Sequence, residues 1–289
     1  MLKQLFKSLV GKQSSPRIAF DRRNLEESHP GEGIYTVNSD GSDCKQIFAS
    51  GYSSYPTWSP NGKWIAFADG DDSNVFVMDE NGKQIRQLTF HQGEGISVSY
   101  LTWSPDSRQL AYCLHEYVHE NHEEQIYVVD LGSGGAKQLT YNGTNTECVW
   151  LPSNEIVFHR NVDQGWGKPF IMNPDGQNQR EYNLLGLRET YPSWSVDGKK
   201  MIYCKVADNL IDRQYFVMNT DGSEKTLIPV KTRVCNMVIS PDGKSVAYSG
   251  GDGDTFEVFV LPLDGNPGKK IVANTEDFNT SELSWSPIV

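Results

Sequence analysis

Short runs rich in aromatic and β-branched residues alternate with turn-forming residues along the whole chain. Residues 75–79, with the sequence VFVMD, are one such run, and the pair Asn81-Gly82 follows it. Asp-Gly and Asn-Gly pairs supply the positive φ that tight hairpins need. The pattern therefore predicts antiparallel strands joined by short turns, and it continues to the C-terminus.

One unit recurs six times, and its marker is a tryptophan in five copies and an isoleucine in one. Successive markers are 45, 47, 44, 45 and 46 residues apart. So narrow a spread indicates a repeat architecture with one four-stranded unit per copy. The markers are Trp58, Trp103, Trp150, Trp194, Ile239 and Trp285.

Each copy is interpreted as four strands. The first strand ends at the marker, a turn of the Ser-Pro-Asp-Gly-Lys type leads to the second, and an Asp-Gly or Asn-Gly turn separates the third from the fourth. The first predicted strand, residues 17–20, corresponds to the second strand of the repeat. The last copy, residues 282–287, contains only the first strand of the repeat. Together these two halves complete one blade, which removes a free sheet edge at the seam.

The repeats predict an all-β fold, a six-bladed β-propeller of four-stranded antiparallel blades. The ring is closed by a composite blade made from both termini. Residues 1–15 are expected to form an N-terminal amphipathic leader, and residues 16–289 a single propeller domain.

The amino-acid sequence of the repeats resembles that of the TolB-like family of six-bladed propellers. The likeness is carried by segments such as YPTWSPNGKWIAF at 55–67, IYVVD at 126–130 and NMVISPDGKSVAY at 236–248, and it extends over residues 16–289. The resemblance implies the propeller fold. We expect neither the export signal nor the separate N-terminal domain of TolB itself.

Charge and composition narrow the classes of function. The chain has 26 Lys and Arg residues and 37 Asp and Glu residues, a formal net charge of −11. An acidic protein lacks the basic surface that phosphate backbones require, so nucleic-acid binding is not expected. No apolar run approaches the ~20 residues that span a bilayer, so no transmembrane segment is predicted.

The N-terminal residues and the cysteines favour a cytoplasmic location. Lys3, Lys7 and Lys12 interrupt what would have to be the apolar stretch of a secretory signal. The five cysteines are an odd number and lie far apart, which fits neither a disulfide framework nor a CxxC metal motif. We expect a cytoplasmic monomer without a cofactor.

A candidate binding site lies three residues before each marker. This position is polar or amphipathic in every copy, and we expect it at the start of the innermost strand, at the channel mouth on the face that carries the loops of varying length. Such a ring would bind a ligand or peptide; alternatively, the tyrosines pack on neighbouring blades and the carboxylates are solvated. The residues are Tyr55, Tyr100, Glu147, Tyr191, Asn236 and Glu282.

Cations just beyond the second strands add charge to the same face. They are Arg22, Arg23, His159, Arg160 and Lys205, of which His159 and Arg160 are included in the candidate ligand-binding site. Near the carboxylates of the ring, they would bind a carboxylate ligand by paired hydrogen bonds. Alternatively, they form ion pairs across blades.

A histidine-rich segment follows the second strand of one repeat. His115, His119 and His122 would share one face of a helix, where imidazoles can coordinate zinc. The alternative is an exposed polar loop, because no sequence signal requires a helix there. No metal site is predicted.

Two functions stay open at the level of sequence. The first is a non-enzymatic TolB-like propeller that binds a protein segment or a small polar ligand at the loop-rich face and channel mouth. It is favoured because no nucleophile, base and orienting group can be assembled from residue spacing. The alternative is a metal-assisted lyase or hydrolase acting on a carbohydrate or peptide, as oligogalacturonate lyases among the TolB-like propellers imply. His159 would then be the base and Arg160 would hold an anionic group, with Glu147 and Tyr191 beside them.

Overall fold

The fold is described from a computed structural model of the chain. It covers residues 15–289 except 25–30, 71–72, 119–120, 162–166, 187, 208–211, 231, 252–255, 274–277, 281 and 288–289. The predicted leader, apart from Ser15, lies outside the described residues. Within these residues the chain is all β, and no helix long and apolar enough to cross a membrane is found there.

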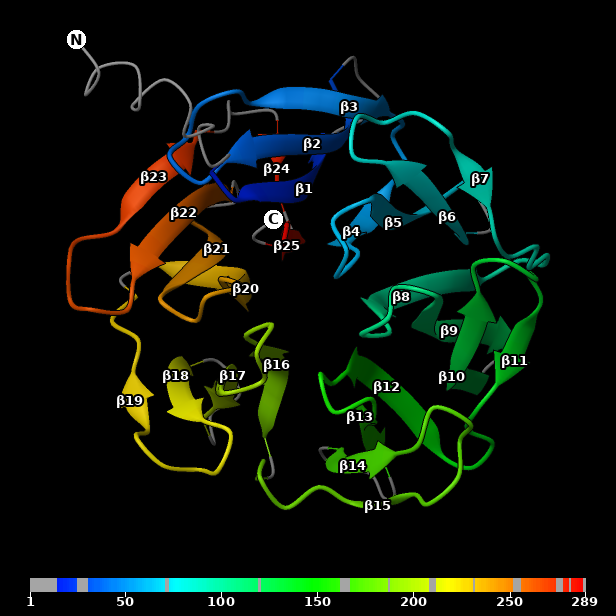
Figure 1. The fold of residues 1–289 in the computed structure, drawn as a ribbon. Helices are drawn as coiled ribbons and strands as arrows, with labels where there is room; N and C mark the ends of the chain where they lie inside the picture. Colours follow the sequence, from blue (N-terminus) through cyan, green and yellow to red (C-terminus); the bar gives the residue numbers. More distant parts are fainter. Residues whose placement is uncertain are drawn as a thin grey trace, which may run out of the picture.

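Six antiparallel sheets stand around a central axis as the blades of a propeller (Figure 1). The first blade contains β4 (Ser54–Trp58), β5 (Trp64–Asp69), β6 (Asn74–Asp79) and β7 (Arg86–Gln87). The second contains β8 (Ile96–Trp103), β9 (Gln109–Val118), β10 (Asn121–Asp130) and β11 (Ala136–Gln138). The third contains β12 (Thr144–Trp150), β13 (Ile156–Asn161), β14 (Lys168–Met172) and β15 (Arg180–Glu181).

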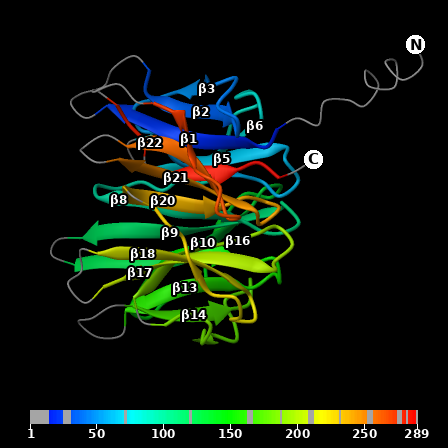
Figure 2. The same ribbon diagram turned by 90° about the vertical axis from the view of Figure 1, so that its left-hand side faces the viewer.

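The remaining blades follow the same order from the axis outwards. The fourth contains β16 (Glu189–Trp194), β17 (Lys200–Val206), β18 (Arg213–Asn219) and β19 (Thr226–Leu227). The fifth contains β20 (Arg233–Ile239), β21 (Ser245–Gly251), β22 (Glu257–Pro262) and β23 (Lys269–Val272). Seen edge-on, the strands cross the ring from one face to the other (Figure 2).

The sixth blade joins the two ends of the chain, as the repeats predict. It contains β1 (Arg17–Asn24), β2 (Gly33–Asn38) and β3 (Lys45–Ala49), and its innermost strand is supplied by β24 (Phe278–Asn279) and β25 (Leu283–Trp285). Ile18 lies opposite Trp285 and Phe20 opposite Leu283. The six-bladed fold with a composite blade is therefore confirmed.

An aromatic pair occupies the centre of every blade. In the first blade Phe67 of β5 lies directly opposite Phe76 of β6, with ring centroids 5.7 Å apart. Directly opposed aromatic residues on neighbouring strands stabilise a sheet beyond the area that they bury. The pairs are Phe20–Tyr35, Phe67–Phe76, Tyr112–Tyr127, Phe158–Phe170, Tyr203–Phe216 and Tyr248–Phe259.

The Ser-Pro turns after each first strand are held by the serine side chain. In the first blade the Oγ of Ser59 accepts a hydrogen bond from the backbone nitrogen of Trp64 at 2.9 Å. Gly62 has a φ of 71°, a conformation that glycine adopts at little cost. The same serine-to-backbone bond recurs at Ser104, Ser195 and Ser240, so these turns form a uniform rim.

The histidine-rich segment is neither a helix nor a loop over most of its length. β9 and β10 continue as a hairpin through it, with His115 opposite Glu124 and His122 opposite Tyr117. The alternation of side chains along paired strands removes the helical face that would have gathered the three imidazoles. His119 lies outside the described residues.

Candidate functional site

A cavity of about 410 Å³ lies on the axis of the ring. Each blade contributes its innermost strand and the turn that follows, which begins with Ser-Pro in four of the six copies, so the wall repeats six times with different side chains. In the first blade the lining runs from Tyr55 through Trp58 to Pro60. The cavity therefore extends from the middle of the channel to the rim made by the Ser-Pro turns.

We call the six residues at the inner end of this cavity the floor ring. They occupy the same position of each repeat, three residues before the marker, and all six line the cavity. The floor ring consists of Tyr55, Tyr100, Glu147, Tyr191, Asn236 and Glu282. Six of the eight predicted site residues are thus brought together around one axis.

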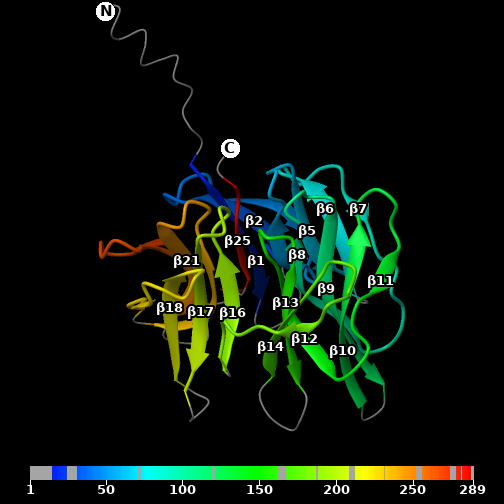
Figure 3. The same cartoon turned by 60° about the horizontal axis from the view of Figure 1, so that its bottom comes forward.

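The expected place of this ring in the channel was wrong. Tyr100 is the fifth of the eight residues of β8, and Glu147 is the fourth of the seven of β12, so neither stands at the start of its strand. Figure 3 shows the β9–β10 and β17–β18 hairpins reaching one face of the ring while β25 runs towards the other. The cavity opens towards the Ser-Pro turns, on the face opposite the variable hairpins.

A β-bulge aims four members of the floor ring. Tyr55, Tyr100, Glu147 and Tyr191 have φ between 51° and 53°, the left-handed region that residues other than glycine rarely adopt. In each case two residues of the inner strand face one residue of the next strand. Because a bulge turns a side chain out of the regular alternation, this geometry directs the ring residues towards the axis.

Three tyrosines, from the first, second and fourth blades, lie close together around the channel. The ring centroids of Tyr55 and Tyr100 are 5.8 Å apart, and those of Tyr100 and Tyr191 are 6.5 Å apart. Burial is the main cause that raises the pKa of all three hydroxyls, and that of Tyr191 reaches about 12. These groups therefore stay neutral hydrogen-bonding partners at physiological pH.

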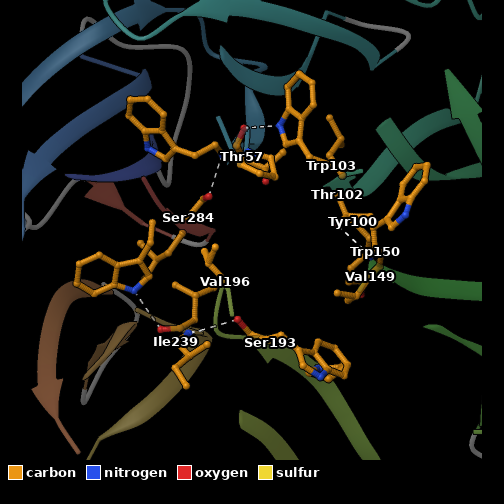
Figure 4. Close-up of a pocket in the computed structure, with 18 of the residues that line it drawn as sticks. Thr57, Tyr100, Thr102, Trp103, Val149, Trp150, Ser193, Val196, Ile239 and Ser284 are labelled. Atoms are coloured by element: carbon orange, nitrogen blue, oxygen red, sulfur yellow. Dashed lines mark hydrogen bonds between the residues drawn. The ribbon is translucent and has the colours of Figure 1, made fainter. Parts of the chain in front are cut away.

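Hydroxyl groups one residue before the marker line the wall above the floor ring (Figure 4). The Oγ of Ser284 accepts from the backbone nitrogen of Trp58 at 2.9 Å, and Oγ1 of Thr102 accepts from that of Trp150 at 3.0 Å. Ser193 and Ile239 repeat the arrangement at 3.3 Å. These bonds join the sixth blade to the first, the second to the third and the fourth to the fifth. The Trp103 and Trp150 indoles point away from the centre of the cavity.

Glu282 stands at the seam of the composite blade. Its Oε2 accepts a hydrogen bond from Nδ2 of Asn236 at 2.9 Å. Burial and the nearby Asp21 carboxylate raise its pKa from 4.5 to about 8, and Arg23 acts in the opposite direction. Arg23 is itself 3.2 Å from the fully buried Asp21.

Glu147 is supported from behind by the predicted His159. The Nδ1 of His159 lies 3.2 Å from Oε2 of Glu147, and its Nε2 is 3.1 Å from the backbone oxygen of Glu189. His159 is buried and does not line the cavity. The histidine therefore lies at ion-pair distance from the carboxylate and is screened from a ligand in the channel.

Arg160 points away from the channel. Its Nε donates to Oδ1 of Asn145 at 2.8 Å, and its guanidinium lies over the rings of Phe158 and Phe170. Of the expected cations, His159 lies beside Glu147 and Arg23 near Glu282, but among the described residues that line the cavity there is no Lys, Arg or His. Ion pairing holds for Arg23 with Asp21, but within one strand instead of across blades.

The described part of the histidine-rich hairpin offers no ready metal site. The Nδ1 of His115 is 2.8 Å from Oε1 of Glu124, and its Nε2 bonds the hydroxyl of Ser99, so both ring nitrogens have partners within the blade. No group of three or more His, Cys, Asp or Glu in the described part of the chain is arranged to hold a metal ion.

Sequence reasoning missed the wall hydroxyls. Thr57, Thr102, Ser193 and Ser284 occupy one column of the repeats, directly before the marker. Their signal was present, because a small hydroxyl residue recurs where an inner strand meets its neighbour. Only the register of the inner strands shows that this column faces the channel.

The fold and the axial cavity define a six-bladed β-propeller with a channel of ligand size. The chain belongs to the TolB β-propeller domain family, whose pattern matches residues 17–289. The Tol-Pal system protein TolB of Francisella tularensis subsp. mediasiatica (strain FSC147) is 22% identical over 238 residues, 80% of this chain and 54% of that protein. The chain thus spans about half the length of the TolB relatives that it matches.

Other similarities extend beyond TolB. Dipeptidyl-peptidase 5 of Porphyromonas gingivalis (strain ATCC 33277) is 26% identical over 275 residues, 88% of this chain and 39% of that protein. The crystal structure of TolB from Acinetobacter baumannii has a TM-score of 0.79 at 19% identity and covers 98% of this chain and 70% of its own. An oligogalacturonate lyase in complex with manganese has a TM-score of 0.58 at 14% identity, over 83% of this chain and 70% of its own. At these identities the structures show the fold alone.

Proposed function

We propose that this protein is a non-enzymatic binding propeller that receives a protein segment, or a small polar ligand, in its axial cavity from the side of the Ser-Pro turns. The observation that carries the proposal is the cavity itself. About 410 Å³ of space is enclosed by equivalent positions of all six blades and ends at a ring of hydrogen-bonding side chains. Ligand sites in proteins are commonly concave, largely apolar and equipped with a few convergent polar groups.

The residues that line the cavity favour ligand binding over catalysis. The carboxylate of Glu147 faces the cavity, but the histidine that accompanies it lies behind the wall and also contacts the backbone of Glu189. The tyrosine hydroxyls are held neutral by burial. Such groups can orient a bound segment through hydrogen bonds and aromatic contacts.

The family also supports a protein partner. The TolB relatives are named as members of the Tol-Pal system, an assembly of proteins. A cytoplasmic location remains a prediction, based on the widely spaced cysteines and on the lysines near the N-terminus. A monomeric state is likewise a prediction.

A substitution that fills the cavity tests the proposal. Val149 lies on the cavity wall, and its side chain makes no hydrogen bond that a substitution would remove. Val149→Trp should abolish the capture of short peptides from a random-peptide library, with an unchanged melting curve. Leu227→Trp, on an outer strand and 50% exposed, is the matched control and should capture the same peptides as the wild type. A peptide set unchanged by Val149→Trp would contradict the proposal.

A further inference from the structure

The ionisable charge facing the cavity has one sign. Among the lining residues, all of which lie in the described part of the chain, the carboxylates are Glu147 and Glu282 and there is no cationic side chain. The two glutamates come from the third and the sixth blade, on opposite sides of the ring. A group at the inner end of the cavity would therefore meet a carboxyl group from either side. Burial and Asp21 raise the pKa of Glu282 to about 8, and a cation bound beside it would lower that pKa again and favour the carboxylate.

Each glutamate keeps an oxygen for a ligand. The Oε2 of Glu147 contacts His159 and the backbone nitrogen of Tyr191, and Oε2 of Glu282 accepts from Asn236. Neither Oε1 atom makes a hydrogen bond to any described residue, and neither is a buried orphan. Because both residues line the cavity, these oxygens are the acceptors that the described residues leave unused there.

The nearest cations are held outside the cavity. Arg23 pairs with Asp21 at 3.2 Å, and the guanidinium of Arg213 lies behind Tyr191, 5.9 Å from its ring centroid. Arg160 is stacked on aromatic rings within its blade. The protein's own positive charges thus do not occupy the place between the two glutamates.

The remaining lining suits a long side chain with an apolar stem. Prolines of the Ser-Pro turns stand at the rim, represented by Pro60, Pro105 and Pro241, and Val149 and Val238 lie deeper on the wall. Lys and Arg bury their methylene stems against apolar surface and place the charged head at a polar site. Tyrosine rings at the depth of that head attract a cation through their negative faces.

We propose that the cavity recognises a cationic side chain, a lysine ammonium or an arginine guanidinium of the bound protein segment, between Glu147 and Glu282 and beside the tyrosines of the floor ring. The inference rests on the proposed function and specifies the chemistry of its ligand. The net charge of −11 adds a long-range attraction for a basic segment.

The test uses blocked amino acids as probes on the full chain. N-acetyl-lysine methylamide and N-acetyl-arginine methylamide are titrated by calorimetry against their neutral counterparts, the norleucine and citrulline derivatives. The cationic probes should bind at least about tenfold more tightly, which corresponds to about 1.4 kcal/mol. The double variant Glu147→Gln, Glu282→Gln should lose this preference, and Glu181→Gln, an exposed carboxylate on β15, should retain it.

The outcomes separate the inference from the proposed function. Equal affinity for charged and neutral probes, no saturable binding of the lysine probe, or a preference that survives in the double variant would each overturn the cationic ligand. The library experiment with Val149→Trp does not depend on ligand charge, so it still decides whether the cavity binds a segment. Melting curves of all variants show whether a lost preference reflects unfolding.

Discussion

The backbone nitrogen of Glu282 donates a hydrogen bond to Oδ1 of Asp21 at 2.7 Å. Asp21 lies in β1 and Glu282 directly precedes β25, and the carboxylate of Asp21 is fully buried. The bond therefore fixes the start of β25 against β1, at the level of the floor ring. Ring closure and the shape of the cavity depend on the same contact.

Removal of this carboxylate should destabilise the whole propeller. In Asp21→Ala the amide of Glu282 loses its acceptor, and an unsatisfied buried donor costs about 1–3 kcal/mol. Urea denaturation followed by tryptophan fluorescence measures the free energy of unfolding. Asp43→Asn is the control, because it removes an exposed ion pair with Lys45 and keeps a residue type that tolerates the φ of 51° at this position; it should change stability by less than about 0.5 kcal/mol. A loss for Asp21→Ala no larger than for the control would contradict the role of the seam.

Glu282 should make stability fall as pH rises. Its pKa is about 8 in the folded protein and 4.5 when unperturbed, so between these values the folded state binds more protons than the unfolded state. Stability decreases with pH wherever the folded state holds the additional proton, by at most about 1.4 kcal/mol per pH unit for one group. The loss is complete above the folded pKa.

The check is the free energy of unfolding of Glu282→Gln across the same pH window. The neutral amide cannot titrate, so the variant should show a shallower decline than the wild type. Glu181→Gln, on the outer strand β15, should keep the wild-type slope. Parallel profiles for wild type and Glu282→Gln would argue against a raised pKa at this site.

The wall hydroxyls should contribute to the junctions between blades. Thr102→Val keeps the shape of the side chain but removes the acceptor of the Trp150 amide, and we expect a loss of about 1–2 kcal/mol. Thr57→Val is the matched control, because Thr57 uses its backbone oxygen, which accepts from Nε1 of Trp103 at 3.0 Å. The thermal unfolding midpoints of the two variants should therefore differ. Equal midpoints would contradict a contribution of the Thr102 hydroxyl to stability.

Thiol reactivity should follow burial. Cys44 is exposed, whereas Cys113, Cys148 and Cys204 are buried. Burial also raises the pKa of the Cys235 thiol to about 11, so few thiolates form there at neutral pH. A thiol reagent should label Cys44 first in the native protein and all five residues in denaturant. The fast phase should vanish in Cys44→Ser; rapid labelling of the buried thiols would show that the blades open.

The fold was predictable because repetition multiplies weak signals. No single turn or strand would identify a propeller, but Trp58 and its equivalents recur at nearly constant spacing, and the strand runs 17–20 and 282–287 complete each other. The composite blade follows from that arithmetic. The aromatic positions found in second and third strands pair directly, as Tyr203 does with Phe216.

The candidate site was only partly predictable. The column that forms the floor ring could be read from the repeats, but its depth could not, since the start of β8 well before Tyr100 is set by pairing with β9. Arg160 follows His159 on β13, and their opposite orientations place the two side chains on different faces of the sheet. The histidine-rich hairpin escaped prediction because strand pairing with its neighbour overrode its polar composition.

The bulges at the floor ring place a limit on how the specificity of this scaffold can change. A bulged residue lies outside the regular pairing of the two strands, so it can be replaced with little effect on their hydrogen bonds. The side-chain chemistry at the inner end of the cavity can therefore differ from blade to blade. The left-handed backbone at Tyr55, Tyr100, Glu147 and Tyr191 nonetheless favours Gly, Asn and Asp and disfavours β-branched residues. Libraries randomised at these positions should therefore yield folded proteins that contain only some residue types there. The backbone conformation limits these types before ligand binding can select among them.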